Sequence, residues 1–221
     1  MRRRSLWSIV GVMLLVGSGA AVEAKEKNHN HLLRGDYAFS GEATCLVSSD
    51  RVVNNVLVPV GFNDNLTPFG PPASFPFVIS FSIQGVRTFN GDGTGSTVAR
   101  IVSISHPFAL PPSGPNAAFF SRGGASSSDF QTDFTYEVAP DRTFTVQTQL
   151  VTGTFDAGTR AGQTVTITNL PPFAGRISKD HRTLTIAHEE AGVQTNTYSN
   201  GDVHHELCHR SRILLEQKGG H

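Results

Sequence analysis

The sequence predicts an all-β protein: a single closed or nearly closed antiparallel up-and-down β-barrel of about eight to ten strands. Apolar and polar residues alternate with a period of two along several long segments, which indicates strands with one buried face. Short turns rich in Gly, Pro, Asn and Asp join these segments in chain order. A barrel of long sequential hairpins has no exposed edges, so we favour it, with a β-sandwich as the alternative.

The chain begins with features of a secretory signal, which we assign to residues 1–24. A basic start precedes an apolar run from Leu6 to Val16, and Ala24 ends a small-residue cleavage site. The run is shorter than the about 20 apolar residues that span a bilayer. We therefore expect an exported protein, periplasmic or extracellular, without a membrane span after cleavage. Both Sec and twin-arginine export remain open.

The mature chain divides into three parts. Residues 25–33 are polar and charged, and we expect a disordered lead-in there. Residues 217–221 are expected to be a frayed tail. The β-barrel domain then covers residues 34–216.

The first half of this domain holds the clearest strand signals. Phe134, Tyr136 and Val138 lie on one face of a strand, with Asp133 and Glu137 on the other. The expected strands and turns of this half are 37–47, 77–83, the glycine-rich turn 90–95, 97–105, 129–138, the turn 139–142 and 143–150.

The second half predicts shorter strands, and two segments interrupt the hairpins. The expected strands are 164–168, 174–177, 183–188, 193–198 and 203–215. Pro59–Pro76 and His106–Ser128 are rich in Pro and Phe and longer than ordinary connections. They either cover one end of the barrel or act as binding loops.

The only two cysteines lie in the first and last long strands. Cys45 and Cys208 belong to a chain with an export signal, so we predict a structural disulfide between them. In a barrel the first and last strands are neighbours, and this bond would link them covalently where the barrel closes.

The inward face of the last strand has two interpretations. If the disulfide sets the face, His204, Glu206 and Arg210 point inward near Tyr37 as a polar anchor. If the apolar pattern sets it, His205 and His209 point inward and the charged residues are solvated. The two faces cannot both be buried without a β-bulge. The apolar pattern favours the second interpretation, with a bulge or a strand-end disulfide.

Composition excludes several classes of function. Lys+Arg and Asp+Glu are balanced at 18 each, which gives no basic surface for nucleic acid. The chain has 15 Phe but only three Tyr and one Trp, which indicates that its aromatic side chains are buried in a core and do not form a solvated sugar-binding surface. His205 and His209 lie about 13 Å apart along a strand, too far to share a metal ion. We expect neither a metal nor a cofactor, and no nucleophile motif is present.

The segments Gly35–Gly41, Gly91–Gly95 and Cys208–Arg212 resemble a group of exported bacterial single-domain β-barrel proteins. That barrel is similar in outline to allene oxide cyclase and dirigent barrels, or to calycins. The first strand carries Gly35-Asp36-Tyr37 where lipocalins carry Gly-x-Trp. The resemblance implies a barrel fold, and it transfers no catalytic residue.

Three functions follow from these observations. The first is binding of an apolar or amphipathic small molecule inside the barrel. The second is a non-catalytic structural or interaction role in the cell envelope. The third is an isomerase or cyclase that uses Glu206, Arg210 or Tyr37. The residues expected to line the ligand site are Tyr37, Phe39, Phe81, Phe134, Phe144, Glu206 and Arg210.

Overall fold

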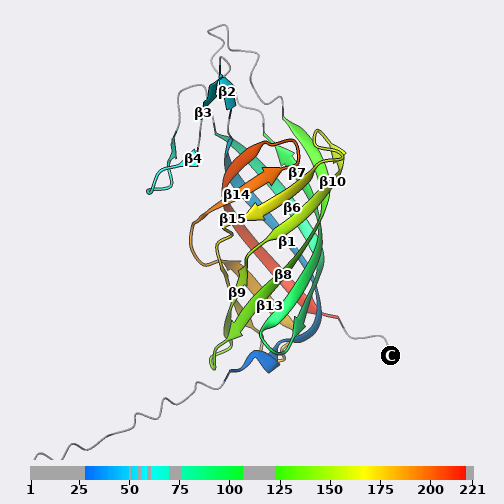
Figure 1. The fold of residues 1–221 in the computed structure, drawn as a ribbon. Coiled ribbons are helices and arrows are strands. Elements are labelled where there is room, and N and C mark those ends of the chain that lie inside the picture. The colour runs from blue at the N-terminus through cyan, green and yellow to red at the C-terminus, as the bar shows by residue number, and fades with distance from the viewer. Residues whose placement is uncertain are drawn as a thin grey trace, which may run out of the picture.

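The chain folds into one curled antiparallel sheet, which confirms the all-β prediction. A computed structural model describes residues 28–49, 51–53, 56–58, 61–69, 76–106 and 123–217. Its 11-stranded sheet closes into a barrel, and two small two-stranded sheets lie beyond one end (Figure 1). Within the described residues, no helix has the length and apolar character needed to cross a membrane. The predicted signal, 1–24, lies outside the described residues.

The elements follow one another in this order: η1 (Asn30–Leu32), β1 (Arg34–Ser49), β2 (Arg51–Val53), β3 (Val56–Val58), β4 (Gly61–Phe62), β5 (Pro68–Phe69), β6 (Phe77–Asn90), β7 (Thr94–Ser105), β8 (Gly124–Val138), β9 (Thr143–Thr148), β10 (Val151–Gly158), β11 (Thr164–Thr168), β12 (Phe173–Ile177), β13 (Thr183–His188), β14 (Val193–Tyr198) and β15 (Val203–Glu216). All pairings between them are antiparallel.

The barrel consists of two stacked rings of 8 strands that share five long strands. The shared strands are β1, β6, β7, β8 and β15. Toward the end that carries η1, which we call the η1 end, β9, β12 and β13 complete the ring. Toward the opposite end, which we call the β2 end, β10, β11 and β14 complete it.

Where the two rings meet, three consecutive strands are interrupted at residues 149–150, 169–172 and 189–192. We call this line of interruptions the seam. Pro171 and Pro172 lack the N–H that a ladder requires, and Asn169 adopts a left-handed φ of 57°. Hydrogen bonds at the seam include one from Gln147 Nε2 to the Leu170 carbonyl at 3.3 Å and one from Glu189 N to the Pro172 carbonyl at 3.3 Å. The sequence analysis predicted neither the seam nor β10.

The η1 half of the barrel is filled by aromatic side chains. Phe89 packs edge-on against four rings, with centroid distances of 5.5 Å to Tyr37, 5.3 Å to Phe134, 5.0 Å to Tyr136 and 6.4 Å to Phe144. Leu33 and Val146 complete this core with no exposed surface. Such packing leaves no room for a ligand in this half.

The disulfide joins directly opposed residues of β1 and β15. Cys45 and Cys208 are bonded, with their Cα atoms 4.0 Å apart, and the pairing continues without a shift from Tyr37–Glu216 to Ser49–His204. The register therefore needs no β-bulge. Because disulfides persist in oxidising surroundings, this bond indicates an oxidising compartment.

The preferred interpretation of the last strand was wrong. His204, Glu206 and Arg210 are buried, whereas His209 is exposed and His205 is only partly buried. The disulfide sets the face, because a strand without a bulge keeps every second side chain on the side of Cys208. Ile213 and Leu215 are consequently 57% and 55% exposed.

Two boundary predictions also need correction. The expected disordered lead-in, 25–33, is ordered from Asn28, because the Asn30 side chain accepts a hydrogen bond from Val138 N at 2.9 Å and Leu33 is buried. The predicted loop His106–Ser128 ends earlier, since β8 begins at Gly124. Its residues 107–122 lie outside the described residues, as do 59–60 and 70–75 of Pro59–Pro76 and 218–221 of the predicted tail.

Candidate functional site

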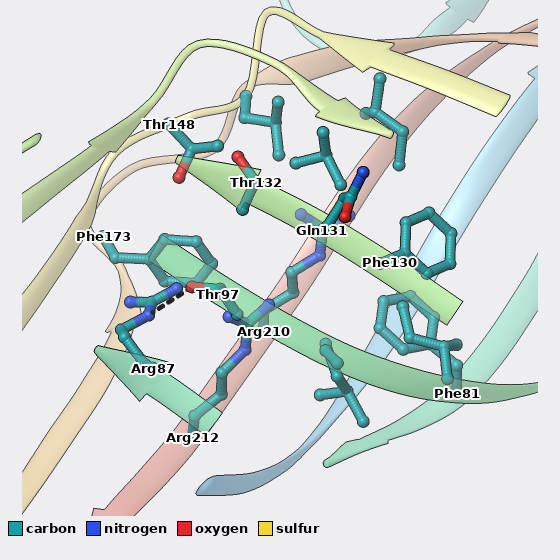
Figure 2. A pocket seen from close by; sticks show the side chains of 16 residues that line it. Phe81, Arg87, Thr97, Phe130, Gln131, Thr132, Thr148, Phe173, Arg210 and Arg212 are labelled. Atoms are coloured by element: carbon teal, nitrogen blue, oxygen red, sulfur yellow. Dashed lines mark hydrogen bonds between the residues drawn. The ribbon is translucent and has the colours of Figure 1, made fainter. Parts of the chain in front are cut away.

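A cavity of about 60 Å³ lies inside the barrel at the level of the seam. Figure 2 shows the side chains around it, among them Arg87, Arg212 and Phe173. Its walls are mostly apolar, with three arginines among them. The lining residues are Phe81, Ile83, Arg87, Thr97, Ala99, Ile101, Phe130, Gln131, Thr132, Thr148, Val151, Ile167, Leu170, Phe173, Arg210 and Arg212.

Arg212 enters the cavity from β15. Its guanidinium carbon lies 5.3 Å from the ring centre of Phe39 and 4.9 Å from that of Phe173. Across the strand pair stands Gly41, where a Cβ would lie 2.6 Å from Cγ of Arg212. The absence of a side chain at Gly41 thus makes room for the arginine stem. Among the described residues, Arg212 has ring contacts and no hydrogen-bond partner for its buried Nε.

Arg87 enters from β6, which is separated from β15, the strand that carries Arg212, by β1 alone. Its Nε donates a hydrogen bond of 3.1 Å to Thr97 Oγ1, and its guanidinium carbon lies 4.7 Å from the Phe134 ring centre. Its Nη1 is buried without a partner among the described residues. Arg87 is 2% exposed, so bulk water does not satisfy this donor.

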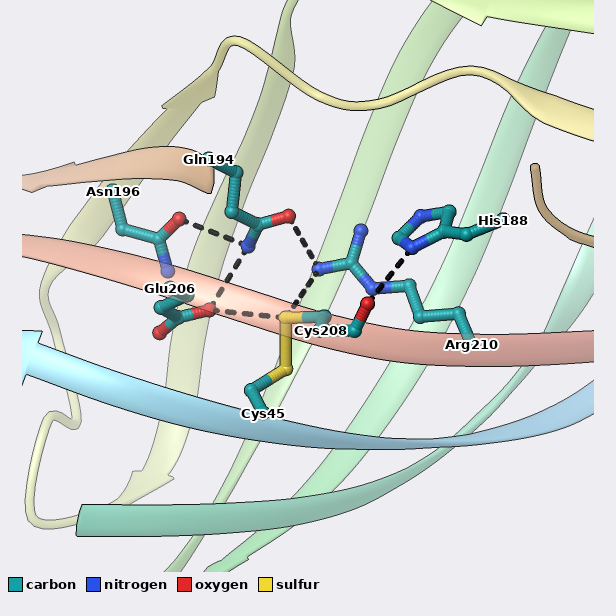
Figure 3. The surroundings of a disulfide bond; sticks show 7 residues. All are labelled: Cys45, His188, Gln194, Asn196, Glu206, Cys208 and Arg210. Carbon is teal, nitrogen blue, oxygen red and sulfur yellow. Dashed lines mark hydrogen bonds between the residues drawn. A yellow bond between two sulfur atoms is a disulfide. The ribbon is translucent and has the colours of Figure 1, made fainter. Parts of the chain in front are cut away.

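Arg210 connects the cavity to a polar cluster beside the disulfide (Figure 3). Its Nη2 donates to Gln194 Oε1 at 2.6 Å, and Gln194 Nε2 donates to Glu206 Oε2 at 2.9 Å. Gln194 thus links the arginine to the carboxylate. Arg210 Nη2 also lies 3.4 Å from Sγ of Cys208. These four side chains form a buried network on the side of the cavity toward the β2 end.

Burial governs the electrostatics of this region. It lowers the pKa of Arg87 and the pKa of Arg210 to about 10 each. Burial also lowers the pKa of Arg212, and the neighbouring Arg87 and Arg210 lower it further. Burial raises the pKa of the Glu206 carboxyl, against the attraction of Arg210. The interior therefore disfavours every one of these charges, and it holds more positive than negative groups.

Two neutral histidines flank the network, His204 buried and His188 partly buried. Burial and Arg210 lower the pKa of His188 to about 4, and its Nδ1 lies 3.0 Å from the Cys208 carbonyl oxygen. Burial and Arg160 lower the pKa of His204 to about 3. Arg160 Nη2 lies 3.1 Å from Nε2 of His204 and covers the ring of Tyr198 at 3.7 Å. As neutral imidazoles, the two histidines add no positive charge to that of the arginines.

The predicted ligand-site residues separate into three groups. Phe81 and Arg210 line the cavity. Phe39 supports Arg212 from behind, and Glu206 belongs to the disulfide network. The other predicted residues, Tyr37, Phe134 and Phe144, belong to the filled η1 half.

Sequence reasoning missed Arg87, Arg212, Thr97 and the seam residues that line the cavity. A usable signal existed for Arg87, because the alternation that places Phe81 and Ile83 inward also places Arg87 inward. Arg212 shares its face with Cys208 by the same rule. Leu170, in the seam, and Phe173, directly after it, line the cavity because the strands break there. The alternation rule does not predict strand breaks.

One group among the described residues has the spacing of a metal site: Cys45, Glu206 and Cys208. The sulfurs of Cys45 and Cys208 form the disulfide, so neither cysteine offers a thiolate to an ion. Comparisons with protein-family profiles, with characterised proteins and with solved structures find no match for this chain. The fold and the cavity define the class: a disulfide-closed β-barrel with a small, arginine-lined interior cavity.

Proposed function

We propose that this protein is an exported β-barrel that binds a small amphipathic molecule in its interior cavity. The observation that carries the proposal is the cavity itself, which combines apolar walls with buried polar donors that have no partner among the described residues. Ligand sites have this composition: an apolar lining with a few polar groups that orient the ligand. A barrel of about eight strands has an interior wide enough for one such molecule.

The position of the cavity supports a binding role. Leu170 lines it from the seam, where strand pairing is interrupted, and Phe173 lines it from the first position of β12. The backbone at a strand break is free of the ladder hydrogen bonds that hold the other walls. The seam is therefore the side of the barrel at which a ligand enters with the least disruption of pairing.

The proposed export rests on two features of the chain. Residues 1–24 have the layout of a secretory signal. The disulfide between Cys45 and Cys208 agrees with an oxidising compartment outside the cytosol.

The structure separates two of the residues named for the catalytic alternative, Tyr37 and Glu206. Tyr37 lies opposite Glu216, and Glu206 lies opposite Val47. Tyr37 and Val47 are thus separated along β1 by about 33 Å at about 3.3 Å per residue. The Tyr37 hydroxyl donates to the His181 carbonyl at 3.0 Å at the η1 end. Tyr37 therefore cannot act on a substrate together with Glu206.

Native mass spectrometry tests the proposed function. The protein is exported and purified from its own host without detergent, and its native mass is compared with its denatured mass. We expect a small-molecule adduct that is lost on denaturation. A bare chain in the native spectrum, with no mass gained on incubation with a library of short amphipathic molecules, would contradict the proposal.

A further inference from the structure

The interior of the barrel holds an excess of positive charge. Arg87, Arg210 and Arg212 are enclosed around the cavity. Glu206 is the only buried carboxylate among the described residues, since every other described Asp and Glu is exposed. Glu206 is hydrogen-bonded to Gln194 and attracts Arg210 electrostatically. One carboxylate offsets at most one of the three guanidinium charges, so the described protein residues leave an excess of positive charge.

The guanidinium groups also retain unused hydrogen-bond donors. Arg87 uses its Nε on Thr97, but its Nη1 has no partner among the described residues. The buried Nε of Arg210 and the buried Nε of Arg212 are likewise without partners there. Buried polar groups in folded proteins are nearly always hydrogen-bonded, and buried charges are nearly always paired. These donors therefore mark a site for a missing acceptor.

The aromatic contacts offset only part of this cost. Phe39 and Phe173 approach the Arg212 guanidinium, and Phe134 approaches that of Arg87. A ring face attracts a cation but accepts no in-plane N–H donor. The rings leave the edges of the guanidinium planes free, and a planar anion binds at those edges.

The shape of the cavity restricts the class of anion. A carboxylate matches the planar fork of a guanidinium and carries a single charge. The remaining walls are apolar, as at Ile101, Ile167 and Leu170, and favour an alkyl chain. A volume of about 60 Å³ lies far below the about 300–1,000 Å³ of drug-sized sites, so the chain must be short.

We propose that Arg87 and Arg212, with Arg210 beside them, bind the carboxylate of a short-chain amphipathic acid whose chain lies against the apolar wall at the seam. This inference rests on the proposed function, since it assigns the ligand class of the same cavity.

The test is equilibrium binding of hexanoate and of its uncharged isostere hexanamide, measured by calorimetry in a buffer free of carboxylates and phosphate. Arg212→Met removes one guanidinium while keeping side-chain bulk, and Arg87→Met does so on β6, on the other side of β1. Arg182→Met is the matched control, because Arg182 is 59% exposed outside the barrel and makes one long ion pair of 3.9 Å to Glu216.

For wild type and for Arg182→Met, we expect the affinity for hexanoate to exceed the affinity for hexanamide by about tenfold or more. Arg212→Met and Arg87→Met should bind both molecules with similar affinity. Retained hexanamide binding shows that a variant is folded. Should Arg212→Met fail to fold, Arg87→Met carries the same comparison.

The remaining outcomes separate the two proposals. Equal affinity of wild type for hexanoate and hexanamide would overturn the carboxylate inference and leave small-molecule binding intact. Inorganic phosphate that binds as tightly as hexanoate would overturn the amphipathic-acid class in favour of a bare anion. Binding of none of these probes would overturn the binding function itself.

Discussion

Removal of the disulfide is expected to destabilise the barrel by an amount that follows from its place in the chain. The double variant Cys45→Ala/Cys208→Ala deletes the bond and leaves both strands otherwise intact. The bonded residues are separated by 163 positions, and closing a loop of that size restricts the unfolded chain by about 5 kcal/mol in the chain-entropy model.

The native state should change little on this substitution. β1 and β15 remain paired from Tyr37–Glu216 to Ser49–His204 without help from the sulfurs. The local cost is the contact between Cys208 Sγ and Arg210 Nη2 at 3.4 Å, together with two small voids. We therefore expect a net loss of about 3–5 kcal/mol, most of which arises in the unfolded state.

Urea denaturation followed by circular dichroism measures this loss. Thr44→Ala, at an exposed position of the same strand, is the control and should change the free energy of unfolding by no more than about 0.5 kcal/mol. A double variant within about 1 kcal/mol of wild type, with an unchanged denaturant slope, would refute the argument that the bond acts by closing a long unfolded loop.

Three further predictions concern the interior. In anion-free buffer, Arg212→Met should raise the free energy of unfolding by about 1–4 kcal/mol, because it removes an enclosed charge without a counter-ion among the described residues. A free energy of unfolding below that of wild type in urea denaturation would contradict this. His188 is neutral when folded, with a pKa of about 4, so wild-type stability should fall as the pH drops from about 6.5 toward 4. His188→Gln should reduce that slope by up to about 1.4 kcal/mol per pH unit, and an unchanged slope would mean that His188 is accessible to solvent. Gly95→Ala should cost about 1–3 kcal/mol in the same denaturation assay, because the added Cβ meets the Phe134 ring, whereas the exposed Ser96→Ala should be nearly neutral.

The barrel architecture was predictable because its strands obey one simple rule. A half-buried strand alternates its side chains, and the sequence around Phe134, Tyr136 and Val138 displays that alternation openly. The pairing of Cys45 with Cys208 followed from the same architecture, since a barrel brings its first and last strands together. Both predictions depend on local pattern and on the topology of closure.

The face of the last strand was predicted incorrectly for a physical reason. Hydrophobicity placed Ile213 and Leu215 inward, yet these residues are exposed, whereas Arg210 is buried and Arg212 is half-buried. A strand whose inward face carries a buried polar network departs from the ordinary hydrophobic pattern. The disulfide was the better guide, because a covalent bond admits no slip of register.

The seam could not be derived from periodicity alone. Pro171 and Pro172 indicate a break, but the matching interruptions at 149–150 and 189–192 depend on how neighbouring strands pair. The cavity is lined by the seam residue Leu170 together with Arg87 and Arg212, which lie far apart in the sequence. Its position is therefore a property of the assembled barrel.

A crystal structure with 6-bromohexanoate tests the central claim most directly, because anomalous scattering locates the bromine independently of the protein density. We predict the carboxylate between Arg87 and Arg212 and the bromine near Leu170 on the apolar wall of the seam. An empty cavity at saturating acid, or a bromine bound only on the outer surface of the barrel, would contradict the account.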